Sequence, residues 1–137
     1  MVPAAVIPQG AVMDKELGER FARALAAKDR EALLSVLAPT VDFRGLTPNN
    51  PWQATSAETL VDDILLGAWF EPTDAIDELE AVENDGIADR ERVAYRLRGH
   101  NPDGPFIVEQ QAYLATEDGR INWLRILCSG FRPVEQA

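Results

Sequence analysis

Two carboxylates stand where a predicted strand could turn them toward a core. Asp42 lies in a short strand predicted over residues 41–46, and Glu109 lies in a strand predicted from Phe106 to about Thr116. Desolvation raises the pKa of a carboxylate that is buried on such a face, which suits it to act as a general acid or base. We therefore expect Asp42 or Glu109 to be a catalytic base, although a solvated carboxylate is the commoner case on a strand.

Polar and aromatic side chains near these carboxylates predict a pocket for an apolar or aromatic small molecule. Gln111 shares a face with Glu109 because side chains alternate along a strand. Trp52 is expected at the pocket rim in a Pro-rich loop, and Trp69 at the end of a helix, whereas Cys128 is expected to be a small buried side chain. The predicted binding residues are Phe21, Trp52, Trp69, Tyr95, Gln111, Tyr113, Leu124, Ile126 and Cys128.

The composition excludes several other kinds of site. The chain has 137 residues, a formal net charge of -10, one Cys and one His. That pair of residues cannot complete a zinc site, so neither a metal nor a cofactor is predicted. The acidic balance repels phosphate backbones and anionic lipid, so nucleic acid and membranes are not expected as partners. Residues 1–13 lack the basic start of a signal peptide, and a cytoplasmic protein is expected.

The first half of the chain is predicted to contain three helices. Asp14 and Asp29 can cap the first two, and the second must end before Pro39 because a proline disfavours helix in the preceding residue. Residues 47–51 have the composition of a loop. The pattern at residues 55–58 is that of a capping box, which opens the third helix.

The second half is predicted to be an antiparallel sheet, because apolar residues alternate with polar ones and turn sequences separate the runs. The last predicted strand, residues 120–129, is apolar on both faces. We place Ile121, Trp123 and Leu127 on one face, and Leu124, Ile126 and Cys128 on the other. Three short helices can cover only one face, so we expect a homodimer through the outer face at Trp123 and Arg125.

The pairing of these strands is left partly open by the sequence. A four-residue turn at residues 101–104 would place Tyr95 beside Gln110, whereas a shorter turn, a longer turn or a bulge would place it beside Glu109 or Gln111. Pairing through the hairpin at residues 118–119 sets Gln111 opposite Ile126.

The order of these elements carries a resemblance to a known family. Four phrases support it: residues 20–29 (RFARALAAKD), 41–45 (VDFRG), 109–113 (EQQAY) and 128–133 (CSGFRP). The chain resembles the SnoaL-like branch of the nuclear transport factor 2-like superfamily over nearly its whole length after residue 14. The resemblance implies an α+β fold in which a curved antiparallel sheet wraps around three helices from the first half, forming a cone with an apolar pocket.

Ketosteroid isomerase, a member of that superfamily, gives a position-by-position comparison. Its oxyanion-hole tyrosine falls on Phe21, its general-base aspartate on Phe43, and its hydrogen-bond-donating aspartate near Gln111. At none of these three positions does this chain carry the residue that ketosteroid isomerase has there. Related cyclases use a histidine in the cavity, but His100 stands beside a predicted turn at the rim. The resemblance therefore does not imply steroid isomerisation by that route.

Together these patterns predict one domain over residues 14–133, with an extended arm at residues 1–13 and a tail at residues 134–137. The predicted function is binding of an apolar or aromatic small molecule, with cofactor-free isomerisation, cyclisation or dehydration as the expected chemistry. The alternative is a non-catalytic dimeric module whose pocket is filled by Phe21, Leu65, Trp69 and Leu124.

Overall fold

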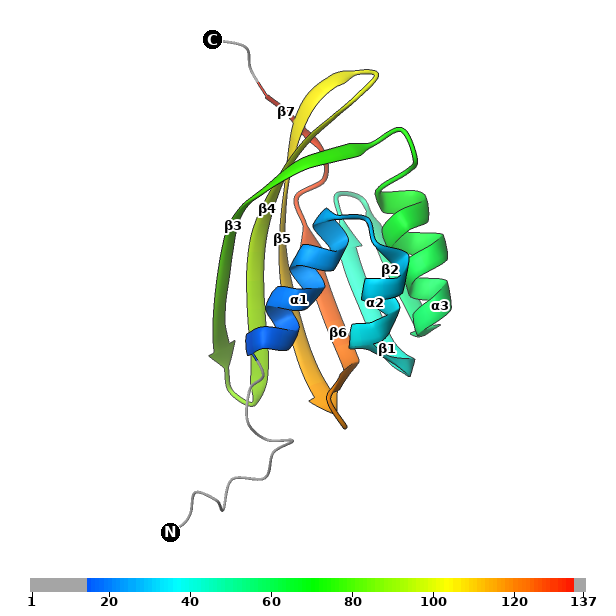
Figure 1. The fold of residues 1–137 in the computed structure, drawn as a ribbon, viewed down its shortest axis with the longest axis vertical. Coiled ribbons are helices and arrows are strands. Elements are labelled where there is room, and N and C mark those ends of the chain that lie inside the picture. The colour runs from blue at the N-terminus through cyan, green and yellow to red at the C-terminus, as the bar shows by residue number, and fades with distance from the viewer. Residues whose placement is uncertain (1–14, 135–137) are drawn as a thin grey trace.

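The computed structural model describes residues 15–134 and has an α+β architecture in which a large sheet bends around the helices (Figure 1). The expected arm, the Asp14 cap and residues 135–137 of the tail lie outside this range. The helices are α1 (Lys15–Ala26), α2 (Arg30–Val36) and α3 (Ala57–Thr59), which continues into the π-helical segment η2 (Leu60–Trp69). The strands are β1 (Leu37–Thr47), β2 (Asn50–Ser56), β3 (Ala75–Ile87), β4 (Arg90–Asn101), β5 (Gly104–Glu117), β6 (Arg120–Cys128) and β7 (Arg132–Pro133).

The sheet is mixed, so the prediction of an antiparallel sheet is wrong at one junction. Its strand order is β2-β1-β6-β5-β4-β3, with β7 pairing with β5. β1 and β6 run parallel, whereas the other neighbours are antiparallel. Parallel pairing requires a long crossover, and the chain between β1 and β6 contains the third helix and four strands. This junction brings the end of β1 beside the end of β6.

The predicted cap of α2 is confirmed, whereas the cap of α3 lies one residue after the Thr55 with which the predicted capping box begins. Asp29 accepts a hydrogen bond from the amide of Ala32 at the start of α2, and Ser56 accepts one from the amide of Thr59 at the start of α3. Each side chain satisfies a backbone donor that the first helical turn leaves unpaired. α2 ends at Val36, before Pro39 as predicted.

A strand replaces most of the loop predicted at residues 47–51. Pro48 and Asn49 make a tight turn in which Asn49 has a φ of 71°. Asparagine tolerates this left-handed conformation, so β1 can fold straight back and pair Thr47 with Asn50. Pro51 is accepted because β2 is an edge strand of the sheet. Trp52 therefore lies in a strand, not in a loop.

The strand registers settle the alternatives that the sequence leaves open. The turn between β4 and β5 has four residues, so Tyr95 pairs with Gln110. A register shift opposite Ala115 and Thr116 leaves Asn122 unpaired, and beyond it Gln111 pairs with Leu127. The predicted pairing of Gln111 with Ile126 is wrong because one extra residue in β6 moves every later partner by one.

The same shift decides which side chains of β6 lie on the inner face of the sheet and which lie on the outer face. Before it, Ile121 is fully buried on the inner face with Leu124 and Ile126, so its predicted place on the outer face is wrong. After it, Trp123 and Leu127 are on the outer face, as predicted. Along β5 the buried positions are Phe106, Val108, Gln110, Ala112 and Leu114. Glu109, Gln111 and Tyr113 therefore project from the outer face.

Candidate functional site

A pocket of about 380 Å³ lies where the ends of β1 and β6 meet the end of η2, and we call it the mouth pocket. Its lining is aromatic and polar without any formally charged residue. It consists of Thr47, Pro48, Trp52, Ala68, Trp69, Phe70, Gln110, Cys128, Ser129, Gly130 and Phe131. An apolar lining with a few hydrogen-bonding groups is typical of sites that hold small molecules.

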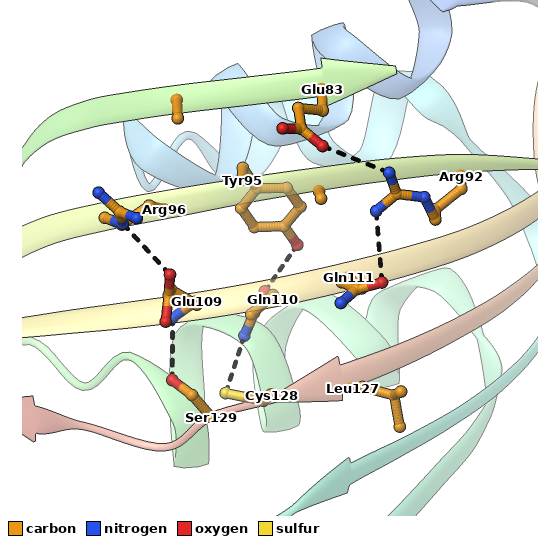
Figure 2. A pocket seen from close by; sticks show the side chains of 12 residues that line it. Glu83, Arg92, Tyr95, Arg96, Glu109, Gln110, Gln111, Leu127, Cys128 and Ser129 are labelled. Atoms are coloured by element: carbon orange, nitrogen blue, oxygen red, sulfur yellow. Dashed lines mark hydrogen bonds and ion pairs between the residues drawn. The ribbon is translucent and has the colours of Figure 1, made fainter. Parts of the chain in front are cut away.

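A row of three polar side chains leads from the core to this pocket. The Tyr95 hydroxyl donates to Gln110 Oε1 at 2.6 Å, and Gln110 Nε2 donates to Cys128 Sγ at 3.2 Å (Figure 2). Tyr95 and Gln110 are 3% and 2% exposed. Burial raises the pKa of Tyr95 well above its usual range, and the nearby Cys128 thiol adds to that effect. Tyr95 is therefore a neutral donor at ordinary pH.

Two tryptophans form one wall of the mouth pocket. The rings of Trp52 and Trp69 meet edge to face, with centroids 6.2 Å apart. Trp52 Nε1 donates to the Thr47 hydroxyl at 2.8 Å. Trp69 Nε1 is buried and has no hydrogen-bond partner among the described residues. A buried donor without an acceptor is costly, so an acceptor that reached Trp69 Nε1 would be stabilising.

Glycine permits the close packing of this wall. A Cβ on Gly45 would stand 2.8 Å from Phe43 Cζ and 3.0 Å from Trp69 Cη2, so β1 can approach Trp69 only without a side chain at this position. Gly130 has a φ of 76°, and a Cβ there would meet Pro48 at 3.0 Å. These glycines set the distance between β1, η2 and the segment after β6.

Phe131 forms the outer edge of the pocket. It is 39% exposed, and its ring lies 4.5 Å from that of Phe106 and 5.5 Å from that of Phe70, measured between centroids. It also lines a neighbouring pocket together with Asp74 and Asn101. Phe131 therefore separates the two pockets at the open end of the cone.

The outer face of the sheet carries a second, charged pocket of about 530 Å³, which we call the outer pocket. Ala81 and Ala94 are among its lining residues, and Figure 2 shows the longer side chains of Arg92, Arg96 and Glu109 around it. The charged groups around it are paired. Arg92 binds Glu83 and Asp85, Arg96 binds Glu80 and Glu109, and Arg132 binds Glu109.

The two predicted catalytic carboxylates both lie on this outer face. Glu109 bridges Arg96 and Arg132, and its side chain is 41% exposed. Asp42 is exposed and pairs with Arg125, with Oδ1 and Nη1 3.3 Å apart. Neither residue lines the mouth pocket. The structure therefore places Asp42 and Glu109 in ion pairs on the outer face and not in the mouth pocket.

The predicted binding residues divide into three groups. Trp52, Trp69 and Cys128 meet in the mouth pocket, and Tyr95 contacts it through Gln110. Tyr95, Gln111 and Cys128 also line the outer pocket, together with the predicted base Glu109. Gln111 and Tyr113 lie on the outer face, where the Tyr113 hydroxyl donates to Gln111 Oε1 at 3.2 Å. The remaining three are core residues no more than 1% exposed: Phe21, Leu124 and Ile126.

The sequence analysis missed Gln110 and Phe131. The sequence left the pairing at residues 101–104 open, and one of the possible pairings, through a four-residue turn, places Tyr95 beside Gln110. That pairing would have identified Gln110. No sequence feature of Phe131 predicts a place in the pocket, apart from its position after Gly130. His100 lies beside the turn between β4 and β5, exposed and bonded through Nδ1 to Asp77 Oδ2 at 2.8 Å.

Two properties of the described residues concern metal ions and membranes. Within residues 15–134, no group of three or more Asp, Glu, His or Cys side chains is arranged to hold a metal ion. None of the helices in that range has the length and apolar character needed to cross a membrane.

Comparison with known proteins identifies the fold. No family model matches the sequence, and no curated protein matches it. A candidate isomerase from Bacillus subtilis is similar in structure, with a TM-score of 0.67 and 15% identity, over 85% of this chain and 90% of that chain. A candidate polyketide cyclase from Pseudomonas putida has a TM-score of 0.64 and 14% identity, over 82% and 88% of the two chains.

A protein of unknown function from Mesorhizobium loti, described as nuclear transport factor 2-like, is also similar. It has a TM-score of 0.59 and 23% identity, over 84% of this chain and 89% of that chain. All three are matched over most of their length, so the likeness extends to the whole domain. The chain described here therefore has the nuclear transport factor 2-like fold.

Proposed function

We propose that the mouth pocket binds an apolar or aromatic small molecule that carries a hydrogen-bond acceptor. The observation that carries this proposal is the buried Nε1 of Trp69, a residue of the pocket wall, which has no partner among the described residues. An acceptor such as a carbonyl oxygen would satisfy this donor in surroundings that favour an aromatic body.

The size and lining of the pocket support this class of ligand. Its volume of about 380 Å³ lies within the range of small-molecule sites. Four of its lining residues are aromatic: Trp52, Trp69, Phe70 and Phe131. The similar structures include a candidate isomerase and a candidate polyketide cyclase, and polyketides are carbon-rich molecules that carry oxygen.

Binding is favoured over proton transfer by the placement of the carboxylates. A general base must reach the proton that it abstracts, within hydrogen-bond distance or through one water. Asp42 and Glu109 lie on the outer face in ion pairs with arginines. Cofactor-free isomerisation, cyclisation or dehydration in the mouth pocket would have to use neutral groups, of which Gln110, Cys128 and Ser129 line the pocket.

Calorimetric titration with a matched pair of compounds tests the proposal. 1-Indanone has a carbonyl acceptor, whereas indane has the same carbon skeleton without it. We expect 1-indanone to bind about five- to tenfold more tightly than indane, since one hydrogen bond is worth about 1 kcal/mol. Trp69→Phe, which keeps an aromatic ring, should abolish the difference between the two compounds.

Trp52→Phe is the matched control, because Trp52 Nε1 already donates to Thr47. This variant should retain the preference for 1-indanone. Absence of binding by both compounds to the unmodified protein would refute the proposal, and so would a preference that survives in Trp69→Phe.

A second candidate function is self-association through the outer face. Leu46 and Leu127 are 53% and 47% exposed there. They line a groove of about 620 Å³ with Pro51 and Arg125. Beside it, Trp123 lies between the guanidinium groups of Arg90 and Arg125, each 4.4 Å from the ring centroid. Exposed leucines with an aromatic residue and arginines are typical of protein interfaces.

Native mass spectrometry tests this second proposal. We expect a dimer that Leu127→Glu converts to a monomer, because the substitution places a charge in the apolar groove. Ile87→Glu is the control, since Ile87 is 58% exposed at the end of β3 and lies outside that groove. A monomeric unmodified protein would exclude the interface.

A further inference from the structure

The sulfur of Cys128 receives two hydrogen bonds at the edge of the mouth pocket. Gln110 Nε2 donates to it at 3.2 Å, and the backbone amide of Gly130 donates at 3.4 Å. Cys128 is half-buried and lines the pocket. Donors aimed at a sulfur stabilise the negative charge that the sulfur carries when it acts as a nucleophile.

The surrounding structure fixes both donors. Tyr95 donates to Gln110 Oε1, so the amide nitrogen of Gln110 is turned toward the sulfur. The Ser129 amide donates to the carbonyl of Glu109, which holds the chain as it leaves β6. Gly130 then adopts a φ of 76° and its amide reaches Cys128. The arrangement is built by three strands and the segment after β6.

Trp69 supplies an independent indication that this pocket receives a ligand. It is 6% exposed, lines the same pocket as Cys128, and its Nε1 has no partner among the described residues. A ligand carbonyl could accept from Trp69 while another carbon of the same molecule faces the thiol. An aromatic ring conjugated to that carbonyl would suit the tryptophan wall.

We propose that Cys128 is a covalent attachment site for aromatic α,β-unsaturated carbonyl compounds held in the mouth pocket. This inference rests on the proposed function, because the ligand must first occupy the pocket. The thiol loses its proton to water, and the sulfur forms a bond to the β-carbon. The electrons of the carbon–carbon double bond move to the carbonyl oxygen as an enolate, which then takes a proton from water at the α-carbon.

The experiment uses the full chain and two matched enones. Benzylideneacetone carries a phenyl group on its β-carbon, whereas 3-penten-2-one carries a methyl group there. Intact-mass spectrometry follows the gain of one enone mass over time, and the chain has a single Cys to report. Each rate is divided by the rate of the same enone with glutathione, which removes differences in intrinsic reactivity.

We expect the corrected rate for benzylideneacetone to exceed that for 3-penten-2-one by about tenfold or more, because binding orients the reacting atoms. Cys128→Ser should give no adduct. Gln110→Leu should slow the reaction by about tenfold, because it removes one of the two hydrogen bonds that favour the charged form of the sulfur, and one hydrogen bond to a charged group is worth about that factor. Gln53→Leu, which replaces an exposed glutamine outside both pockets that Cys128 lines, should leave the rate unchanged. The enone comparison and Cys128→Ser test the inference even if Gln110→Leu does not fold.

Two outcomes distinguish this inference from the proposed function. If 1-indanone binds but the corrected rates of the two enones are equal, the covalent site is refuted and the binding function stands. If 1-indanone does not bind and the enones show no preference, both fail. An adduct that persists in Cys128→Ser would also refute the inference, because it would lie on another residue.

Discussion

Gln110 and Gln111 are adjacent and chemically identical, yet they belong to different environments. Gln110 is 2% exposed and lies between Tyr95 and Cys128 on the inner face. Gln111 is exposed on the outer face, where it accepts from Arg92 at 3.3 Å and from Tyr113 at 3.2 Å. One position along β5 thus separates a buried neutral network from an exposed charged one.

This difference shows on which face of the sheet a polar group can make a strong and specific hydrogen bond. On the inner face polar groups are few, and each hydrogen bond is strengthened by the low dielectric around it. On the outer face the charges are numerous and paired, and water and salt screen them. A ligand of the outer pocket would have to compete with ion pairs such as that between Arg96 and Glu109. A ligand of the mouth pocket meets Trp69, a donor that lacks a partner.

The largest expected contrast between the two faces is at Phe43 and Asp42. Phe43 is 1% exposed and packs edge to face on Trp69, with centroids 6.0 Å apart. Phe43→Ala should lower the free energy of unfolding by about 3–5 kcal/mol, because it removes buried area and leaves a cavity. Asp42→Ala should cost about 0–1 kcal/mol, since it removes only an exposed ion pair with Arg125.

Urea denaturation of the two variants measures this contrast. Comparable losses in both would mean that β1 does not divide its side chains between a core and a solvated face. The pair also bears on the site, because Phe43 occupies the position of the ketosteroid isomerase base and is a core residue here.

The two glutamines give the next largest contrast. Gln110→Leu has a similar volume but removes the acceptor of the buried Tyr95 hydroxyl, so the free energy of unfolding should fall by about 1–3 kcal/mol. Gln111→Leu should change it by less than about 0.5 kcal/mol. Thermal unfolding followed by circular dichroism compares them. A larger loss in Gln111→Leu would reverse the assignment of the two faces.

The contribution of Tyr95 to the free energy of unfolding should depend on pH, which gives a further test of the buried network. Its pKa is raised in the folded protein, mainly by burial, whereas the unfolded chain ionises near the ordinary value of about 10. The unfolded state therefore loses the proton first, and the stabilisation by neutral Tyr95 is full below about pH 10 and falls as the pH rises above it. The slope approaches 1.4 kcal/mol per pH unit at most.

Tyr95→Phe separates this effect from other alkaline titrations. The variant should be about 1 kcal/mol less stable than the unmodified protein at neutral pH, because Gln110 Oε1 loses its donor. The difference should shrink above about pH 10 in urea denaturation. A difference that stays constant from pH 8 to 11 would mean that Tyr95 ionises freely in the fold.

Much of the fold was predictable because its signals are local. Asp29 and Ser56 cap helices whose apolar stripes recur at helical spacing, and Val93, Tyr95 and Leu97 alternate in a way that only a strand explains. The parallel pairing of β1 with β6 was not predictable, because it joins segments far apart in the sequence. Strand β2 was hidden by Pro51, which disfavours central strands but not edges.

The site was less predictable because it depends on one unpaired residue. Asn122 shifts the register of β6, so that Cys128 pairs with Gln110 and not with Glu109. Trp52, Trp69 and Cys128 were identified from residue type and do meet in one pocket. Asp42 and Glu109 were chosen for their chemistry, but their face depends on strand parity that the sequence left open.

The smallest expected effect is at Glu109, and it tests the outer face most directly. Glu109→Gln removes the charge that bridges Arg96 and Arg132 but keeps the size of the side chain. The free energy of unfolding should fall by about 1 kcal/mol or less, and the loss should shrink in 1 M salt because exposed pairs are screened. The affinity for 1-indanone should not change, since Glu109 does not line the mouth pocket. A marked loss of affinity in calorimetric titration would connect the two faces through β5 and restore Glu109 as a residue of the binding site.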